Sequence, residues 1–476
     1  MKKWFNYMLL CLALASLPSC KKWLDVRPED KFTEADLYTN ASGFEDAMNG
    51  LYLQCSSTNM YGARLTMTTM DALAKLYHLT SENNLYQIAN YNYGDASSLS
   101  QIDATWSNLY KAILNMNKLL QSLETYGNVL DLKTRNMYKG EVLALRAFCY
   151  FDLMRMFTKP YALSPTDNVL PYYDKATYEI SDFKSNAFIM ERILKDLGDA
   201  EQLLQQNDPA VTQAQVSKAT LSLVRNSRNY RMNYYAVKAL QARVNLWKDD
   251  KPAALAAAQT LIANQAKFPW TEFSDLNISE SSNKVFATEM IFGIESTELT
   301  KTFNDNFAPS LLDGKILAGN PTGAFISATI FEGFASDYRF QFVWKIDGKP
   351  YYTFFKYKNG SNVSQSCNNT IPLIKMGEMY LIAAECETDP AKALDNLNAL
   401  RTHRGIAALV GSLSTTQLND RIMREYRKEF YGEGQLFFYY KRKQMTSVAG
   451  ATNNVIVSMS PSNYTFPIPL SETRPR

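Results

Sequence analysis

Histidine is almost absent from this 476-residue sequence, which contains only His78 and His403. The sequence also has no H-E-x-x-H motif, no paired C-x-x-C motif and no phosphate-cradling glycine loop. These absences remove the usual ligands of a metal and the usual cradle of a nucleotide, so no metal site and no cofactor is predicted. His403 falls in the last turn of a predicted helix, where a cation is favoured, which indicates capping rather than catalysis.

An excess of charge of one sign is also missing. The 50 basic and 47 acidic residues give a formal net charge of +3, and no basic run is long enough to bind a phosphate backbone. No nucleic-acid partner is therefore predicted. Beyond the first 20 residues, no apolar run reaches the roughly 18 residues that a membrane-spanning helix needs.

Cysteine is scarce, and the six cysteines do not form the framework of a disulfide-rich fold. Cys149 and Cys386 lie within helical patterns and are predicted to be buried thiols. Cys55 and Cys367 could pair or remain free, and the sequence does not distinguish these two states.

The N-terminus reads as a targeting segment. Two lysines precede the apolar stretch Trp4–Ala15, and Leu17-Pro18-Ser19-Cys20 looks like a bacterial lipobox. Residues 1–19 are therefore predicted to be a lipoprotein signal peptide, Cys20 to carry acyl chains, and residues 20–30 to be a lipidated tether. Several acyl chains on one residue give stable membrane anchoring, because each buried methylene contributes about 0.8 kcal/mol. The alternative is an ordinary secretory signal with an incidental cysteine.

Two stretches far apart in the chain have the pattern of paired helices. In Ile374–Arg404, apolar and alanine residues recur at three- and four-residue spacing on either side of a short turn, where Asp389 and Pro390 favour a helix start. Asn233–Ile262 repeats this arrangement with alanines where the helices meet. The pattern is typical of tetratricopeptide-like hairpins, which must stack to bury their apolar faces. Two unrelated helix pairs in an ordinary all-α protein are the alternative.

The fold class predicted from these patterns is mostly α, a tetratricopeptide-like helical hairpin scaffold with a loop-rich insert containing short β-strands. Residues 31–476 are expected to form one domain, with helical repeats at about 31–265 and 371–445 and the insert at about 266–370. Within the insert, Phe340–Ile346 and Tyr351–Tyr357 flank Asp347-Gly348, a hairpin signal. A helix is also expected over Ala63–Leu79.

Sugar binding needs flat rings to cover C–H faces and planar polar groups to bond hydroxyls. The non-helical pattern of Asn83–Ser100 supplies both, and Tyr91, Asn92 and Tyr93 are the first candidates for ligand contact. The second candidates are Phe303, Asn304 and Phe307 in the insert, where Asn306 lies between them. Alternatively, the tyrosines only pin a long loop to the helices. No catalytic residue is predicted.

Several short motifs, taken in order, resemble the RagB/SusD nutrient-uptake lipoproteins of Bacteroidetes outer membranes. After the lipobox, the motifs are Asn49-Gly50-Leu51-Tyr52, Trp106 to Ile113, Leu145-Arg146-Ala147-Phe148, Glu378 to Glu385, and Phe466-Pro467-Ile468-Pro469. The resemblance implies a mostly helical protein that sits on a partner SusC-like TonB-dependent outer membrane transporter. It also implies that the protein captures an oligosaccharide or a peptide, and that it is lipid-anchored in the outer membrane and faces the cell exterior.

Two other classes of protein stay open. An α-helical glycan-cleaving lipoprotein would use paired carboxylates, which no sequence motif reveals. The clustered Glu425, Glu429 and Glu433 are interpreted instead as an ion-paired face, with Arg421 one turn from Glu425. A purely helical interaction scaffold would bind no small ligand.

Overall fold

The structure is a computed structural model that describes residues 34–177, 179–214, 227–278, 283–319, 325–361, 367–452 and 455–473. The predicted signal peptide, Cys20 and the tether lie outside these ranges. Within the described ranges, no helix combines the length and the apolar character that a bilayer crossing requires.

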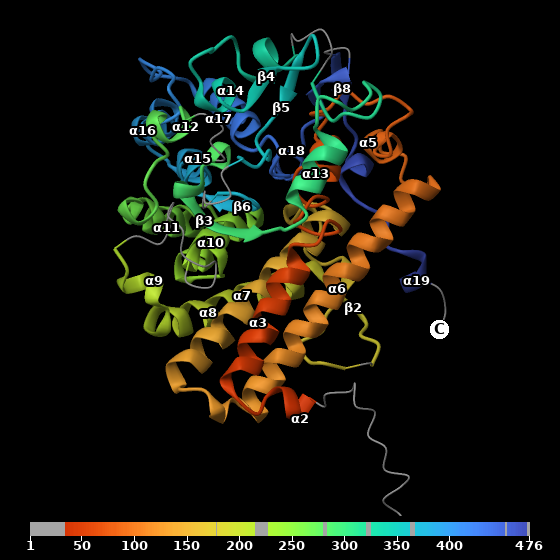
Figure 1. The fold of residues 1–476 in the computed structure, drawn as a ribbon, viewed down its shortest axis with the longest axis vertical. Coiled ribbons are helices and arrows are strands. Elements are labelled where there is room, and N and C mark those ends of the chain that lie inside the picture. The colour runs from red at the N-terminus through yellow and green to blue at the C-terminus, as the bar shows by residue number, and fades with distance from the viewer. Residues whose placement is uncertain are drawn as a thin grey trace, which may run out of the picture.

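Four long helices build the N-terminal half, in the lower part of Figure 1. They are α3 (Ala41–Cys55), α6 (Ala96–Thr125), α7 (Leu132–Phe157) and α8 (Asn186–Asn207). Asp95 and Asp131 cap α6 and α7, because each carboxylate accepts the backbone N–H of a residue in the first turn. α7 lies between α6 and α8 and contacts both, so its second half is buried on all sides. The continuous helix expected over Ala63–Leu79 is wrong: only α4 (Thr69–Leu73) is α-helical there.

The two predicted hairpins are confirmed, and they stack. The first is α10 (Tyr234–Lys248) with α11 (Lys251–Ile262), and the second is α15 (Met376–Cys386) with α16 (Pro390–Thr402). α11 packs against α15, so the hairpins bury their apolar faces against each other. The predicted cap is present, since the Asp389 carboxylate accepts the Ala391 N–H at 2.9 Å.

The insert is closed at its base by a strand pair from distant parts of the chain. β3 (Met290–Glu295) runs antiparallel to β6 (Thr370–Lys375), which places Glu295 opposite Thr370. The predicted hairpin is confirmed in shorter form as β4 (Trp344–Ile346) with β5 (Tyr352–Phe354). The remaining short elements are α2 (Glu34–Leu37), α5 (Tyr86–Ala89), α9 (Pro209–Thr212), α12 (Phe273–Leu276), α13 (Leu299–Asn306), α14 (Tyr338–Gln341), α17 (Thr415–Glu429), α18 (Leu436–Arg442), α19 (Leu470–Thr473) and the pairs β1 (Asn168–Pro171) with β2 (Phe183–Ser185) and β7 (Ser447–Gly450) with β8 (Val455–Ser458).

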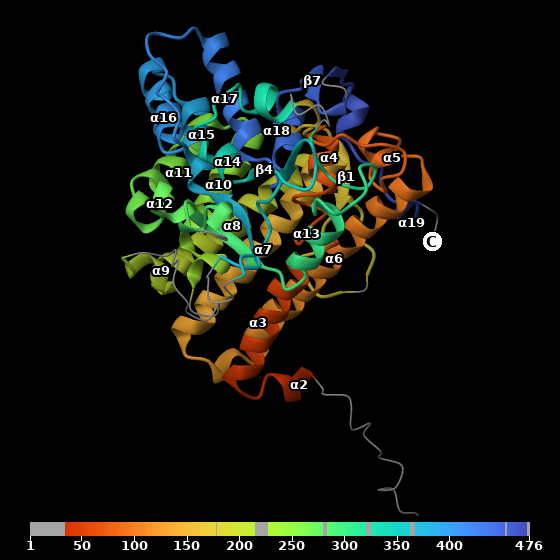
Figure 2. The same cartoon turned by 45° about the horizontal axis from the view of Figure 1, so that its top comes forward.

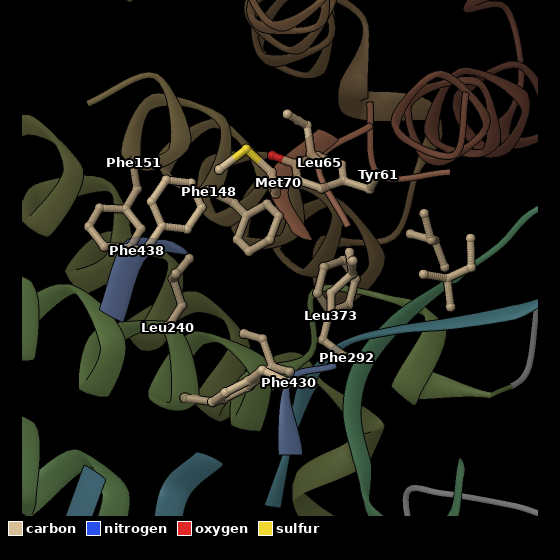
Figure 3. Packing of buried hydrophobic residues seen from close by; sticks show 14 of the residues in the cluster. Tyr61, Leu65, Met70, Phe148, Phe151, Leu240, Phe292, Leu373, Phe430 and Phe438 are labelled. Atoms are coloured by element: carbon tan, nitrogen blue, oxygen red, sulfur yellow. The ribbon is translucent and has the colours of Figure 1, made fainter. Parts of the chain in front are cut away.

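One hydrophobic core joins the N-terminal helices, the insert and the C-terminal helices. Figure 3 shows Phe148 of α7 beside Phe292 of β3, with Phe430 and Phe438 from the C-terminal part nearby. The rings of Phe148 and Phe292 meet edge to face with centroids 5.9 Å apart. The base of the insert is therefore fixed by the same core that packs the helices.

A chain of buried ion pairs ties the insert to α17. Arg339 of α14 contacts Glu425 and Glu429 at 2.8 and 3.1 Å, and Arg404 contacts Glu429 at 2.9 Å. The predicted pairing of Arg421 with Glu425 is wrong, because Glu425 points into the core and Arg421 contacts Glu332 instead. The chain continues through pairs of Arg339 with Asp337, Arg401 and Lys428 with Glu425, Arg404 with Glu289, Lys375 with Glu429 and Glu433, and Lys356 with Glu433.

The question left open for cysteine has an answer within the described residues. Cys55, Cys149 and Cys386 are buried free thiols, so Cys55 forms no disulfide, and Cys367 is also buried. Cys55 lies beside Cys149 instead, where the interaction with the Cys55 thiol and then burial raise the pKa of Cys149. These thiols pack as small apolar groups.

Candidate functional site

The two segments predicted to contact a ligand lie next to each other. The backbone N–H of His78 donates to the Ala318 carbonyl at 2.8 Å, and the Asn83 amide donates to the Lys315 carbonyl at 2.9 Å. The segment 311–319 is in turn joined to the end of α13, since the Leu317 N–H donates to the Asn306 carbonyl at 2.7 Å. Residues 78–95 and 299–319 therefore form one surface, the loop face, near α5 and α13 in Figure 2.

Tyr91 and Tyr93 attach the loop face to the scaffold. The Tyr91 hydroxyl donates to the Leu73 carbonyl at 2.8 Å, and the Tyr93 hydroxyl donates to the Asn463 carbonyl at 2.5 Å. The ammonium group of Lys75 lies 4.3 Å from the centroid of the Tyr91 ring. Burial raises the pKa of both phenols well above its usual value. These contacts are the ones expected if the tyrosines pin the long loop to the helices. Ligand contact by Tyr91 and Tyr93 stays a prediction.

The two asparagines are the exposed members of the predicted set. Asn92 is exposed and its amide donates to the Gln87 side chain at 3.1 Å, and Asn304 is exposed on α13. Phe303 and Phe307, by contrast, pack in the core, with Phe307 fully buried between Tyr77 and Phe354. The sequence interpretation treated this part of the insert as non-helical. The four-residue spacing of the two rings is that of one helix face, which α13 turns inward.

A ring-lined pocket that the sequence analysis did not identify lies beside α6. It has a volume of about 320 Å³ and lies between α6 and the segment 171–180, with Trp106, Tyr110 and Tyr173 in its wall. The centroid of the Tyr110 ring is 4.8 Å from that of Trp106 and 6.0 Å from that of Tyr173. The Tyr110 hydroxyl donates to the Pro171 carbonyl at 2.9 Å, which holds the segment against the helix.

A second hollow of about 930 Å³, which Tyr173 also lines, continues along α6 and has polar groups in its wall that include Gln121, Glu124 and Lys139. We refer to the two hollows together as the α6 groove. The volume of each hollow is within the range of small-molecule sites, and the groove combines aromatic rings with carboxylate, ammonium and amide groups. The sequence contains an indication of this groove, because Trp106 and Tyr110 are four residues apart and the loop opposite them contains Tyr172 and Tyr173.

The carboxylates of the buried ion-pair chain are unsuited to proton transfer. Burial alone would raise the pKa of Glu425, but the positive charges of Arg339, Lys428 and Arg401 outweigh it and lower the pKa to about 2. Burial alone would also raise the pKa of Glu429. The positive charges of Arg404 and Lys375 outweigh this effect and lower the pKa well below its usual value. A general acid must instead hold a proton near the working pH. Both carboxylates therefore act as fixed charges.

Asp71 is the opposite case. Burial raises its pKa to about 8, although the backbone N–H groups of Gly432 and Gly434 donate to it at 2.5 and 2.9 Å and oppose the shift. Its side chain is fully buried, so it holds the turn at 432–434 rather than reaching a substrate. In the part of the chain that the structure describes, no group of three or more His, Cys, Asp or Glu side chains is arranged to hold a metal ion.

Comparison with known families gives matches over most of the chain. Residues 22–246 match a family profile described as "Starch-binding associating with outer membrane", and residues 320–473 match one described as "SusD family". A similar curated protein, SusD-like protein P2 of Formosa agariphila, is 22% identical over 93% of this chain and 90% of its own length. SusD-like protein P38 of the same organism is 25% identical over 56% of this chain and 47% of its own length.

Solved structures share the fold. A SusD superfamily protein from Bacteroides thetaiotaomicron superposes with a TM-score of 0.71 at 22% identity, covering 91% of this chain and 97% of that one. A SusD-like carbohydrate binding protein from Bacteroides vulgatus gives 0.69 at 20% identity, covering 91% and 96%. A protein described as a laminarin binding SusD-like protein gives 0.63 at 17% identity, covering 91% and 97%. These likenesses support the mostly helical, tetratricopeptide-like fold predicted from the sequence.

Proposed function

Because this chain belongs to the SusD/RagB family, we propose that it captures an oligosaccharide and passes it to a SusC-like TonB-dependent transporter. The observation that carries the proposal is the match of both halves of the chain, in order, to profiles of this carbohydrate-binding family. A similar fold in a protein described as laminarin-binding favours a glycan over the alternative ligand, a peptide.

The α6 groove is the proposed place for sugar rings. Tyr173 is half-buried in its wall beside Tyr110, and a ring edge or face next to a hollow can cover the apolar side of a pyranose. Gln121 and Glu124 farther along α6 offer groups for sugar hydroxyls. Over the length of α6 that lines the groove, from Trp106 to Glu124, a helix rises about 27 Å, enough for several sugar units.

The loop face is a second proposed contact surface. Its exposed amides, Asn92 and Asn304, are proposed to reach a bound polymer directly. The rings of Tyr91, Tyr93, Phe303 and Phe307 are proposed to fix the loops that present these amides, since their contacts are with the scaffold. Binding loops held by a rigid framework are common in ligand-binding proteins.

The proposal includes no catalysis. Paired carboxylates that cleave a glycosidic bond need one member with a raised pKa next to the substrate, whereas Glu425 and Glu429 are matched by buried cations. A glycan-cleaving lipoprotein remains the second candidate, and the experiment below separates the two.

The proposed location follows from the N-terminal sequence. A lipobox ending in Cys20 favours acylation and anchoring in the outer membrane, with the helical domain facing the cell exterior beside its transporter. Growing the native host with labelled palmitate tests this part directly: label should appear in the wild-type protein and be lost in a Cys20→Ala variant.

The test of function is a glycan and peptide array followed by calorimetry with the best ligand. Binding without any shortening of the sugar is expected, and release of shorter products would support the enzyme instead. Tyr173→Ala should weaken binding about tenfold, the loss of roughly one aromatic contact with its buried area. Tyr161→Ala, which removes another half-buried tyrosine that does not line the groove, should bind as the wild type does. Equal affinity of both variants and the wild type would exclude the groove.

A further inference from the structure

A polar hollow on the insert has an excess of positive charge. It has a volume of about 810 Å³ and lies between the start of α13, the β4–β5 hairpin and residues 358–361. Two exposed lysines line it, Lys345 and Lys358, against one aspartate, Asp347. A hollow with this balance attracts anions.

Lys345 and Lys358 both lie near one aromatic ring. Their ammonium groups lie 5.7 and 5.5 Å from the centroid of Phe355, and both side chains are exposed. Neither ammonium group lies within 4.0 Å of a carboxylate among the described residues. This distinguishes them from Lys349 on the same hairpin, which contacts Asp313 at 2.6 Å.

The hollow is built on rigid parts of the insert. Phe355 is buried, and its ring packs on that of Phe303 in α13 with centroids 6.0 Å apart. The Asn359 amide donates to the Thr300 hydroxyl at 2.9 Å and to the Asn369 side chain at 2.7 Å. These bonds join residues far apart in the sequence, so the wall beside the two lysines is preformed before any ligand arrives.

We propose that this hollow binds an anionic substituent, a carboxylate or a sulfate, on a sugar of the captured oligosaccharide. The two ammonium groups neutralise the anion, and their contacts with the buried Phe355 ring keep both lysine side chains beside the hollow. The inference rests on the proposed function, which it deepens by naming an acidic glycan as the substrate class. A neutral glycan would leave two neighbouring cations in the hollow without a partner.

The hairpin explains how one ligand would reach both surfaces. Lys345 and Asp347 line the hollow, whereas Lys349 and Tyr351 contact Asp313, which belongs to the loop face. The hairpin thus contacts both the hollow and Asp313 of the loop face, and Thr300 of the loop face also lines the hollow. An extended acidic polymer that occupies the hollow can therefore also reach the loop face.

The experiment compares matched acidic and neutral probes. Trigalacturonate is titrated against its methyl ester, and a sulfated oligosaccharide against its desulfated form, by calorimetry at 25 and 250 mM NaCl. At the lower salt concentration, an acidic probe should bind at least about tenfold more tightly than its neutral partner, and the preference should shrink at the higher one. Which of the two pairs shows the preference identifies carboxylate or sulfate as the preferred group.

Variants assign the preference to the hollow. Lys345→Gln with Lys358→Gln should abolish the preference for the acidic probe and leave the affinity for its neutral partner within about twofold. Lys349→Gln removes the same charge from the other side of the hairpin and should keep the preference. Both lysines are exposed, so the thermal unfolding curves should match that of the wild type.

Three results would overturn the inference: no preference for either acidic probe, a preference that survives in the double variant, or one that is lost equally in Lys349→Gln. Binding of neutral glycans on the array, combined with any of these results, removes the anion site and leaves the proposed function standing. Absence of binding to every glycan on the array would remove the proposed function itself.

Discussion

Replacing Arg404 with methionine should lower the free energy of unfolding by about 3–5 kcal/mol. The Arg404 side chain is fully buried, donates to Glu289 at 2.8 and 2.6 Å, and donates to Glu429 at 3.1 and 2.9 Å. Methionine fills a similar length without charge, so the variant leaves Glu289 without its cation while Glu429 keeps Lys375 and Arg339. The expected loss of unfolding free energy is therefore that of one buried carboxylate without a counter-charge, because the contributions of ion pairs in one network are not additive.

Urea unfolding followed by far-ultraviolet circular dichroism measures the change, as a shift of the midpoint at unchanged slope. Arg424→Met is the matched control, because Arg424 pairs with Asp420 on the surface and its loss should cost less than about 1 kcal/mol. Adding Glu289→Gln to Arg404→Met should restore part of the stability by removing the stranded charge. A loss below about 1 kcal/mol in Arg404→Met would refute the view that this chain of ion pairs holds the insert.

Three further predictions concern pH and the loop face. The Glu425 pKa of about 2 lies below its usual value of 4.5, so stability from this group is complete above about pH 4.5 and is lost as the pH falls toward 2. Urea midpoints between pH 2 and 6 should therefore depend less on pH in Glu425→Gln. The raised Asp71 pKa has the opposite effect: the folded state retains a proton that the unfolded state has released, so unfolding free energy should fall as the pH rises from about 4 to about 8, and Asp71→Asn should remove this slope. Replacing Tyr91 and Tyr93 by alanine should weaken glycan binding if they order or contact the ligand surface, and unchanged affinity in a folded variant would remove the loop face as a binding site.

The parts of the fold that the sequence predicted are those fixed by local chemistry. The α15–α16 hairpin follows from its apolar spacing, the Asp389 cap and Pro390, all within one short stretch. The pairing of β3 with β6 could not be predicted, because its partners are about 80 residues apart and neither strand has a turn that fixes a register. In the same way, α4 is cut short by turns whose hydrogen bonds no periodicity reveals.

The same distinction between local sequence and long-range contacts applies to the candidate site. Residue type and loop placement identified the Asn83–Ser100 segment as a candidate. They could not show which of its side chains bond to the scaffold, because the partner of Tyr93 is Asn463, which lies 370 residues away in the sequence. Trp106 is buried in the core, yet it also lines the groove because a distant segment stops short of covering the helix. Such hollows depend on where chain segments meet, which one sequence does not specify.

The strand pair at the base of the insert affects how this protein could be re-engineered. Because Glu295 and Thr370 face each other, the segment between them leaves and re-enters the scaffold at one point. We refer to this segment as the cassette. The cassette also carries Arg339 and Lys356, the counter-charges of Glu425, Glu429 and Glu433 outside it. A chimera that borrows this segment from a relative must import equivalent cations at those two places, or Glu425, Glu429 and Glu433 will each lose one of their buried counter-charges.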